Sequence, residues 1–265
     1  MKRYLLIFGL FIFVCFCKNA VVLCSPQASI DALIIENREK LEQATNDGDR
    51  ERLYEARQLF ERMLTMKQKE FLVHYYIALA SQNLYYLIYD NEEQKAELIK
   101  NAIEHLELSI KSNKKFAESW ILLANMYGLK IGVDSKNTIS LSKKQKKALR
   151  TALKLEPENP RRFLVSGRSA YFTPKAFGGG MEKAEKDLLQ ALELFSSYVA
   201  KSKAYPIWGH DETYVWLGQI AVKQKKFKAA EEYYQQALKL NPNYNWVSNY
   251  LMPQLKEKMA SGADS

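Results

Sequence analysis

Few residues of this chain have the types and spacing that catalytic or metal sites require. The histidines are His74, His105 and His210, and no two of them have metal-ligand spacing in the sequence. The segment "WGHDE" at 208–212 combines a histidine with two acidic residues, but it opens a helix, where Asp211 is a natural N-cap. No Gly-x-Ser-x-Gly or zinc-protease motif is present. We therefore predict no enzyme activity, no catalytic residues, no metal and no cofactor, although distant Ser, His and Asp residues could still meet in space.

Three consecutive glycines, Gly178, Gly179 and Gly180, precede a strongly helical segment and raise the question of a phosphate-binding loop. Such a loop needs a preceding strand, and a Walker loop needs a Lys-Ser/Thr pair after the glycines. Neither feature is present around "AFGGGMEK", which follows one helix and enters another. We interpret the glycines as a turn that needs positive backbone angles, with Gly180 near a helix N-cap and Phe177 packed on neighbouring helices. A contribution of this loop to a ligand site stays open.

The spacing of apolar residues at 213–242 predicts two antiparallel helices. On the facing sides, small residues let the helices approach and larger ones fill the gap: Tyr214, Leu217, Gly218 and Ala221, then Ala230, Tyr234 and Ala237. Pro242 ends the second helix. This is the pattern of the tetratricopeptide repeat, a helix–turn–helix unit of about 34 residues.

The same period, projected backwards, finds three earlier helix pairs at 73–113, 117–157 and 161–192, each with inserted residues. A weaker amphipathic pair before them is a degenerate repeat or a cap, and a final helix kinked at Pro253 covers the open end. The predicted fold class is all-α, with antiparallel helix pairs stacked as a superhelix of about four to five repeats. The predicted divisions are a signal peptide at 1–24, an N-terminal helical pair at 25–70, repeats with inter-helix insertions at 71–242, and a capping helix with a tail at 243–265.

The first residues have the layout of a secretory signal, with Lys2 and Arg3 followed by an apolar run at 4–17. Lys18 cuts this run, which is short for a permanent membrane span. A lipid anchor and a retained membrane anchor are the alternatives. A bulky residue before each candidate cysteine argues against acylation, because that position usually carries a small residue: Leu23 before Cys24, and Phe16 before Cys17.

Cysteine usage and charge fit an exported protein. All three cysteines lie in the leader, so the chain after it has no thiol for a disulfide. The formal net charge is +9, which behind an export signal favours acidic envelope surfaces or solubility over nucleic acid. We predict a periplasmic or outer-envelope-associated protein of a Gram-negative bacterium, with no membrane span after signal cleavage and no nucleic-acid partner.

Residues 159–195, "NPRRFLVSGRSAYFTPKAFGGGMEKAEKDLLQALELF", and the following "YPIWGHDETYVWLGQ" resemble a group of exported tetratricopeptide proteins of Bacteroidetes-type bacteria. In that group, an Asn-Pro-Arg, a Phe-Gly-Gly-Gly loop and a Trp-Gly before the last repeat recur together. The resemblance covers roughly 159–217 and implies a fold and an envelope location rather than an activity. A looser likeness connects the chain with the tetratricopeptide partner of TRAP-type (tripartite) uptake transporters, which also has a glycine-containing insertion.

The first helix of each repeat is expected to line a concave face, where polar side chains could grip a carboxylate or a peptide backbone. The predicted binding residues are Asn125, Arg161, Arg168, Tyr171, Gln219 and Lys223. The insertions are expected to add contacts along one rim through Phe177, Gly178, Gly179, Gly180, Trp208 and Gly209. The predicted function is a non-enzymatic interaction scaffold that binds a protein or peptide. The alternatives are a small-molecule-binding accessory of an uptake system and an ordinary solvated groove.

Overall fold

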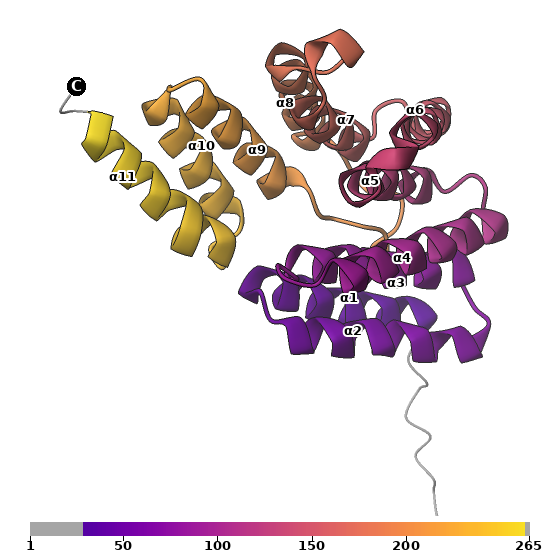
Figure 1. Cartoon of the computed structure of the whole chain (residues 1–265). Helices are drawn as coiled ribbons and strands as arrows, with labels where there is room; N and C mark the ends of the chain where they lie inside the picture. The colour runs from indigo at the N-terminus through magenta and orange to yellow at the C-terminus, as the bar shows by residue number, and fades with distance from the viewer. Residues whose placement is uncertain (1–28, 263–265) are drawn as a thin grey trace, which may run out of the picture.

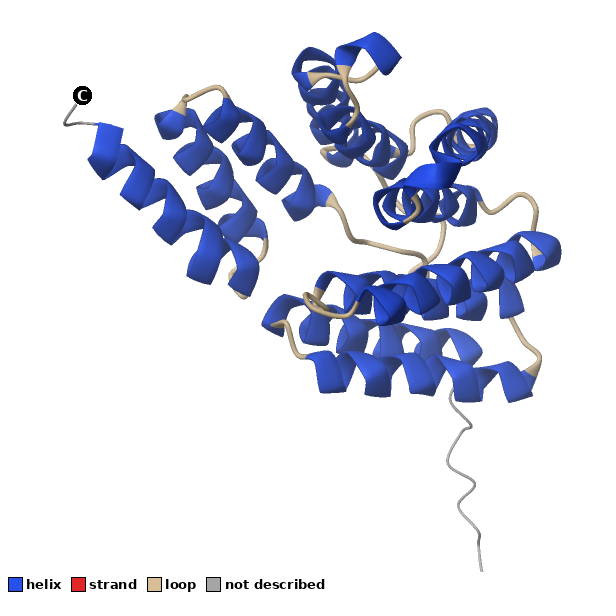
Figure 2. Cartoon of the chain, viewed as in Figure 1, coloured by secondary structure: helices blue, strands red, loops and turns tan. Residues whose placement is uncertain are grey.

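The computed structural model describes residues 29–262, and this part of the chain is helical without strands (Figures 1 and 2). The predicted signal peptide at 1–24 lies outside the described residues. Within them, no helix has both the length and the apolar character needed to cross a membrane. The helices are α1 (Ile30–Asp47), α2 (Arg50–Met63), α3 (Glu70–Tyr86), α4 (Glu92–Ser112), α5 (Ala117–Val133), α6 (Thr138–Leu155), α7 (Pro160–Phe172), α8 (Met181–Phe195), α9 (His210–Lys223), α10 (Phe227–Leu240) and α11 (Met252–Gly262).

Successive helices form pairs, and the pairs stack in chain order. Each odd-numbered helix from α1 to α9 packs with the helix after it, and the second helix of each pair packs on the next first helix. First helices of adjacent pairs also touch, as α5 and α7 do, whereas the second helices have no comparable contact in residues 29–262. The stack therefore curves toward its first helices, which line its inner face. This confirms the predicted all-α superhelix of stacked helix pairs.

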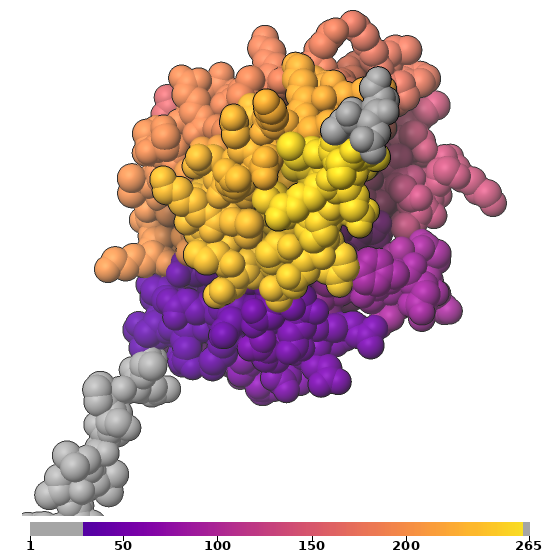
Figure 3. All heavy atoms as spheres, turned by 90° about the vertical axis from the view of Figure 1, so that its left-hand side faces the viewer, coloured from indigo at the N-terminus to yellow at the C-terminus, as the bar shows by residue number. Residues whose placement is uncertain are grey.

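The superhelix brings its last repeat back to its first helix. The Asn241 side-chain amide donates to Asn46 Oδ1 at 2.9 Å, and the Asn245 amide donates to the Asp47 carbonyl oxygen at 3.1 Å. Figure 3 shows the C-terminal helices in yellow lying against the N-terminal helices in indigo. The inner face is therefore enclosed by helices that are nearly 200 residues apart in sequence.

Small residues let paired helices approach, as the spacing predicts. At Gly218 in α9, an added Cβ would lie 2.3 Å from the ring of Tyr234 in α10, whose side chain is buried. At Gly167 in α7, it would lie 2.7 Å from Leu188 in α8. Packing at these two glycines thus depends on the absence of a side chain.

Gly218→Ala is expected to lower the free energy of unfolding by about 1–2 kcal/mol, because the new methyl group overpacks the α9–α10 contact. Gly132→Ala is the matched control, since Gly132 is also helical and its added Cβ would meet nothing within 4 Å. The control should be neutral or slightly stabilising. Urea denaturation of both variants measures the difference, and equal effects would contradict the close helix approach.

The inserted residues of the earlier repeats mostly lengthen the helices instead of forming loops. α3, α4, α5 and α6 have 17, 21, 17 and 18 residues, compared with 13, 15, 14 and 14 in α7 to α10. The predicted rim of inter-helix loops is therefore reduced in these repeats to short turns.

The glycine triplet forms a tight turn between α7 and α8. A short 3-10 helix, Lys175–Phe177, precedes Gly178 and Gly180, which have φ angles of +84° and +103°. Gly180 is the N-cap of α8, and its N–H donates to the Ala170 carbonyl oxygen at 2.9 Å. The Phe177 side chain is 73% exposed, so the prediction that it packs on neighbouring helices is wrong. The turn is closed by backbone hydrogen bonds and does not need the aromatic ring.

The C-terminal helix starts with a π-helical turn, Val247–Leu251, which leads into α11. Pro253 follows this turn and has no N–H, so regular α-helical bonding cannot continue through it. Val247, Leu251 and Leu255 are buried in the same cluster as residues of α9 and α10. The last helix thus covers the apolar side of the last repeat.

Candidate functional site

The long connection between α8 and α9 runs through the inside of the superhelix (Figure 1). Arg161 donates from Nε to the Trp208 carbonyl oxygen at 2.9 Å and from Nη2 to the Pro206 carbonyl oxygen at 2.5 Å. The Tyr76 hydroxyl donates to the Ala204 carbonyl oxygen at 2.8 Å, and Arg38 donates to two further carbonyl groups. The inner face therefore already holds a segment of its own chain, mainly by its main-chain carbonyl groups.

A buried ion pair supports this connection. Arg161 Nη1 lies 2.9 Å from Glu118 Oε1, and both side chains are 2% exposed. Asn159 donates to the same carboxylate at 2.7 Å, and the Trp208 ring flanks the guanidinium group at 5.6 Å. Burial opposes the charge of Arg161, but the Glu118 carboxylate raises the pKa of Arg161 above the ordinary arginine value.

Arg168 occupies a similar position further along α7. Its Nη1 donates to Glu212 Oε1 at 2.6 Å, and its Nη2 donates to the Tyr86 hydroxyl. The rings of Tyr86 and Trp216 lie 5.5 and 5.2 Å from its guanidinium carbon. Arg161 and Arg168, both predicted to grip a guest, are thus engaged inside the protein, where they join repeats together.

The other predicted binding residues are distributed along the inner face. Asn125 is buried and donates to the Gln82 side-chain oxygen. Gln219 donates to the Tyr234 hydroxyl at 2.7 Å, and Lys223 Nζ lies 4.1 Å from the ring centroid of Tyr171. Tyr171 and Gln219 are half-buried and Lys223 is exposed. The contact of Lys223 with Tyr171 joins α9 to α7, whereas Asn125 lies on α5.

An open pocket remains where the last repeat meets the first. It has a volume of about 410 Å³ and is bounded by α1, α3, the start of α9, the end of α10 and the connection at 206–209. The predicted insertion residues Trp208 and Gly209 line it, whereas Phe177 and the glycine triplet do not. Its polar lining residues include Glu42, Gln82, Asn83, Asp211, Glu212 and Tyr244.

The position of Asp211 in this pocket differs from its predicted role. The N-cap of α9 is Gly209, which has a φ of +109°, and Asp211 lies in the first turn. Asp211 Oδ2 accepts a hydrogen bond from the Asn241 amide at 2.8 Å, so Asp211 connects α9 to the end of α10. The Asp211 carboxylate therefore lines the pocket and does not cap the helix.

Burial raises the pKa of Glu42 to about 7, although the nearby Arg38 opposes the shift. Glu39 and Asp211 raise the pKa further, because each carboxylate disfavours another negative charge nearby. Sequence reasoning missed Glu42 and Gln82. They lie on helices α1 and α3, and only the closure of the superhelix brings them near Asp211.

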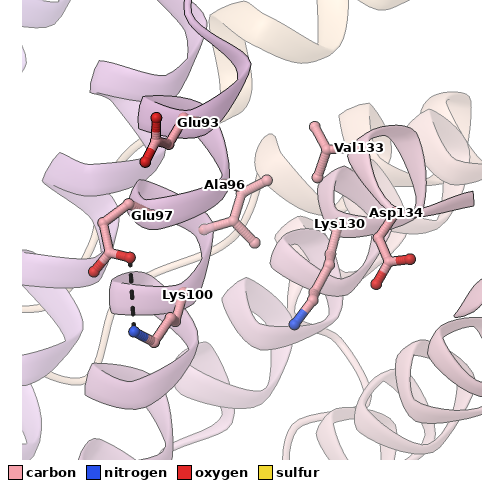
Figure 4. Close-up of a pocket in the computed structure, with 8 residues that line it drawn as sticks. Glu93, Ala96, Glu97, Lys100, Lys130, Val133 and Asp134 are labelled. Atoms are coloured by element: carbon pink, nitrogen blue, oxygen red, sulfur yellow. Dashed lines mark ion pairs between the residues drawn. The ribbon is translucent and has the colours of Figure 1, made fainter.

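A second pocket, of about 430 Å³, lies between α4 and the end of α5 (Figure 4). Its charges are mixed on both sides: α4 contributes Glu93, Glu97 and Lys100, and the end of α5 contributes Lys130 with Asp134 just after it. Glu97 and Lys100 already form an ion pair at 3.6 Å, with both side chains more than half exposed. Such exposed pairs are well solvated, so this pocket carries no preference for a guest.

Two histidines that are 31 residues apart in sequence meet on α3 and α4. His74 Nδ1 and His105 Nδ1 lie 2.8 Å apart, a hydrogen-bond distance that requires one ring to donate and the other to accept. Burial, together with the neighbouring His74 and Arg57, lowers the pKa of His105 to about 4. Burial also lowers the pKa of His74, so the two rings form a neutral hydrogen bond. No group of three or more metal-ligating side chains occurs in the described residues.

Comparisons with known proteins agree with this architecture. The tetratricopeptide repeat family model matches residues 212–244. The HusA haemophore from Porphyromonas gingivalis is similar in structure, with a TM-score of 0.61, 17% identity, and coverage of 72% of this chain and 92% of HusA. TTC0263, a thermophilic TPR protein of Thermus thermophilus, has a TM-score of 0.56 and 19% identity, with 86% of this chain and 100% of TTC0263 covered.

At these identities the two structures share the fold with this chain. A search of curated proteins finds no match. The family match falls on α9 and α10, the pair whose small residues carry the repeat pattern most completely. The chain therefore contains a tetratricopeptide repeat at 212–244 and has the stacked helical superhelix of tetratricopeptide repeat proteins.

Proposed function

We propose that the protein is a non-enzymatic scaffold that binds a protein or peptide partner at the open pocket of its inner face. One observation carries this proposal: the inner face holds the chain's own connection through hydrogen bonds to its main-chain carbonyl groups. Groups that bind one segment by its backbone suit another, because such bonds do not depend on the guest's side chains. The pocket is the part of this face that the connection leaves open.

We place the scaffold in the envelope of a Gram-negative bacterium, as the Bacteroidetes-type resemblance implies. The charged start and short apolar run at 1–17 support export. Expression of the full chain followed by N-terminal sequencing of the mature protein tests this location. Cleavage near residue 24 is the expected result, and recovery of the intact N-terminus in the cytoplasm would contradict it.

Site-directed photocrosslinking in cells tests the binding site. A photoreactive amino acid at Asn83, in the pocket, should form a defined adduct with the partner. The matched control is position Leu189, which is 47% exposed on α8, a second helix of its pair. The same adduct at both positions, or an adduct only at Leu189, would place the partner elsewhere and reject the pocket.

A second candidate function, binding of a small planar ligand in an uptake system, is favoured by an aromatic cluster on α7 and α9. Phe172 is 71% exposed although its ring lies 4.9 Å from Tyr171 and 5.6 Å from Trp216. An exposed aromatic surface of this kind stacks on planar ligands. Among the similar structures, HusA is described as a haemophore, which makes haem a suitable probe.

Haem titration followed by absorption spectroscopy tests this candidate. Phe172→Ala should weaken saturable binding, whereas Phe177→Ala should not, because Phe177 is equally exposed but lies on the α7–α8 turn. Equal effects of the two variants, or no saturable binding by the unchanged protein, would reject the candidate.

A further inference from the structure

The charge of the open pocket is opposite in sign to that of the chain. The chain has a formal net charge of +9, yet the residues that line the pocket include Glu42, Asp211 and Glu212 and no lysine or arginine. The contrast is local, because the arginines nearest to it point into ion pairs in the surrounding walls. A guest that enters the pocket therefore meets carboxylates first.

The three carboxylates differ in how far their charge is compensated. Glu212 binds Arg168 at 2.6 Å, and Glu42 lies 3.4 Å from Arg38 Nε. Asp211 has no cationic group within 4.0 Å among residues 29–262. Its hydrogen bonds come from the backbone N–H of Glu212 and from the Asn241 amide. Asp211 is thus the carboxylate that a cation would stabilise most.

A second observation, independent of the acidic residues, concerns Gln82. Its side chain lines the pocket and is only 3% exposed. Its oxygen accepts a hydrogen bond from Asn125, but its amide nitrogen has no hydrogen-bond partner in the described part of the chain. Unlike the Nε atoms of Arg38 and Arg168, this nitrogen is not fully buried, so it is open to the pocket, where a guest can supply an acceptor.

One residue of a peptide can bind both groups together. A main-chain carbonyl group supplies an acceptor for Gln82, and a cationic side chain supplies a partner for Asp211. The apolar stem of such a side chain would pack on Trp208 and Leu79, which also line the pocket. The volume of about 410 Å³ lies within the range of roughly 300–1,000 Å³ that is usual for small binding sites.

We propose that the pocket binds a lysine or arginine side chain of an extended peptide, with its cationic head between Glu42 and Asp211 and a main-chain carbonyl group at Gln82. This inference rests on the proposed function, because it names the chemistry of the guest at the same site. It makes the partner a peptide segment with an accessible basic residue. It also excludes acidic segments, whose carboxylates would face Asp211 without a counter-charge.

The test uses blocked tripeptides, acetyl-Gly-X-Gly-amide, in which X is lysine, arginine, norleucine or glutamate. Binding is followed by NMR through the Trp208 indole N–H and the Gln82 side-chain amide. The lysine and arginine peptides should bind saturably, and the norleucine peptide, which has a similar length without the charge, should bind about tenfold more weakly. Equal binding of lysine and norleucine peptides, tighter binding of the glutamate peptide, or no binding at all would overturn the inference.

Asp211→Asn should weaken binding of the lysine peptide about tenfold and leave binding of the norleucine peptide unchanged. Glu182→Gln, at an exposed site on α8, is the control and should change neither. Thermal unfolding checks that each variant folds, and Glu42→Gln is the second variant should Asp211→Asn be unstable.

A crosslinked partner at Asn83 that is insensitive to Asp211→Asn would leave the proposed function standing and reject the basic guest. Saturable binding of the lysine peptide without any crosslinked partner would support the basic guest and reject the proposed function.

Discussion

Arg161→Met is expected to lower the free energy of unfolding by about 3–5 kcal/mol. The substitution leaves the Glu118 carboxylate buried without its counter-charge, and it removes the donors that hold the carbonyl groups of Pro206 and Trp208. Both effects act inside the superhelix, where water cannot compensate. Urea or thermal denaturation of the two proteins measures the loss.

The ion pair between Lys175 and Glu182 provides the matched control. Its distance of 3.0 Å is close to that of the Arg161–Glu118 pair, but its side chains are 81% and 85% exposed. Lys175→Met should therefore leave stability unchanged within error. Replacing Arg161 and Glu118 together should cost less than replacing Arg161 alone, because the uncompensated charge is then absent. A small effect of Arg161→Met would show that the connection at 203–208 does not depend on this pair.

Glu42→Gln is expected to stabilise the protein by about 2 kcal/mol at pH 8 and to have little effect near pH 4.5. Burial raises the pKa of Glu42 from 4.5 to about 7, so the folded protein holds a proton that the unfolded chain releases between these values. The contribution of Glu42 to the free energy of unfolding is therefore most favourable below pH 4.5, and it becomes less favourable as the pH rises to about 7. Because the side chain is 31% exposed, the expected effect is smaller than the whole shift implies.

Several charged groups face Glu42: Arg38 and Glu39 on α1, Asp211 on α9, and Arg161 on α7. The neutral Tyr76 hydroxyl on α3 also faces it. The histidines have the opposite linkage, since burial lowers the pKa of His105 to about 4 and its stability contribution falls as the pH decreases. When the pH is lowered from 8 to 4.5, the free energy of unfolding should thus decrease more in Glu42→Gln than in the unchanged protein. Glu36→Gln, on the exposed side of the same helix, is the control. If the free energies of unfolding of Glu42→Gln and the unchanged protein differ by the same amount at every pH in this range, the raised pKa of Glu42 is contradicted.

The stacked helix pairs were predictable from the sequence because the signal is local. Gly218, Ala230 and Tyr234 lie within one repeat, and their spacing sets the approach of α9 and α10 without reference to the rest of the chain. The same holds for Gly180, because a run of three glycines indicates a turn that needs positive φ angles. Local patterns of this kind specify which elements form and how neighbouring ones pack.

The content of the inner face was not predictable in the same way. Arg161 and Arg168 lie on a first helix, as the repeat period indicates, but their partners are Glu118, Tyr86 and Glu212, which are 43, 82 and 44 residues away. The contact of Tyr76 with Ala204 spans 128 residues. Which of these side chains are free for a guest depends on the path of the connection and on the curvature of the stack. Small rotations between successive repeats set this curvature, and no single repeat encodes it.

The central claim is that the last repeat lies against the first helix and so creates the pocket. Cysteines introduced at Asn46 and Asn241, whose side chains are hydrogen-bonded at 2.9 Å, test it directly in a chain with Cys15, Cys17 and Cys24 changed to serine. A short bis-maleimide should crosslink the two positions within one molecule, with a yield that falls when urea unfolds the protein. A pair at Asn46 and Leu189 should give no such product under the same conditions. Absence of the Asn46–Asn241 crosslink in the folded protein would contradict the closed superhelix and the guest site that depends on it.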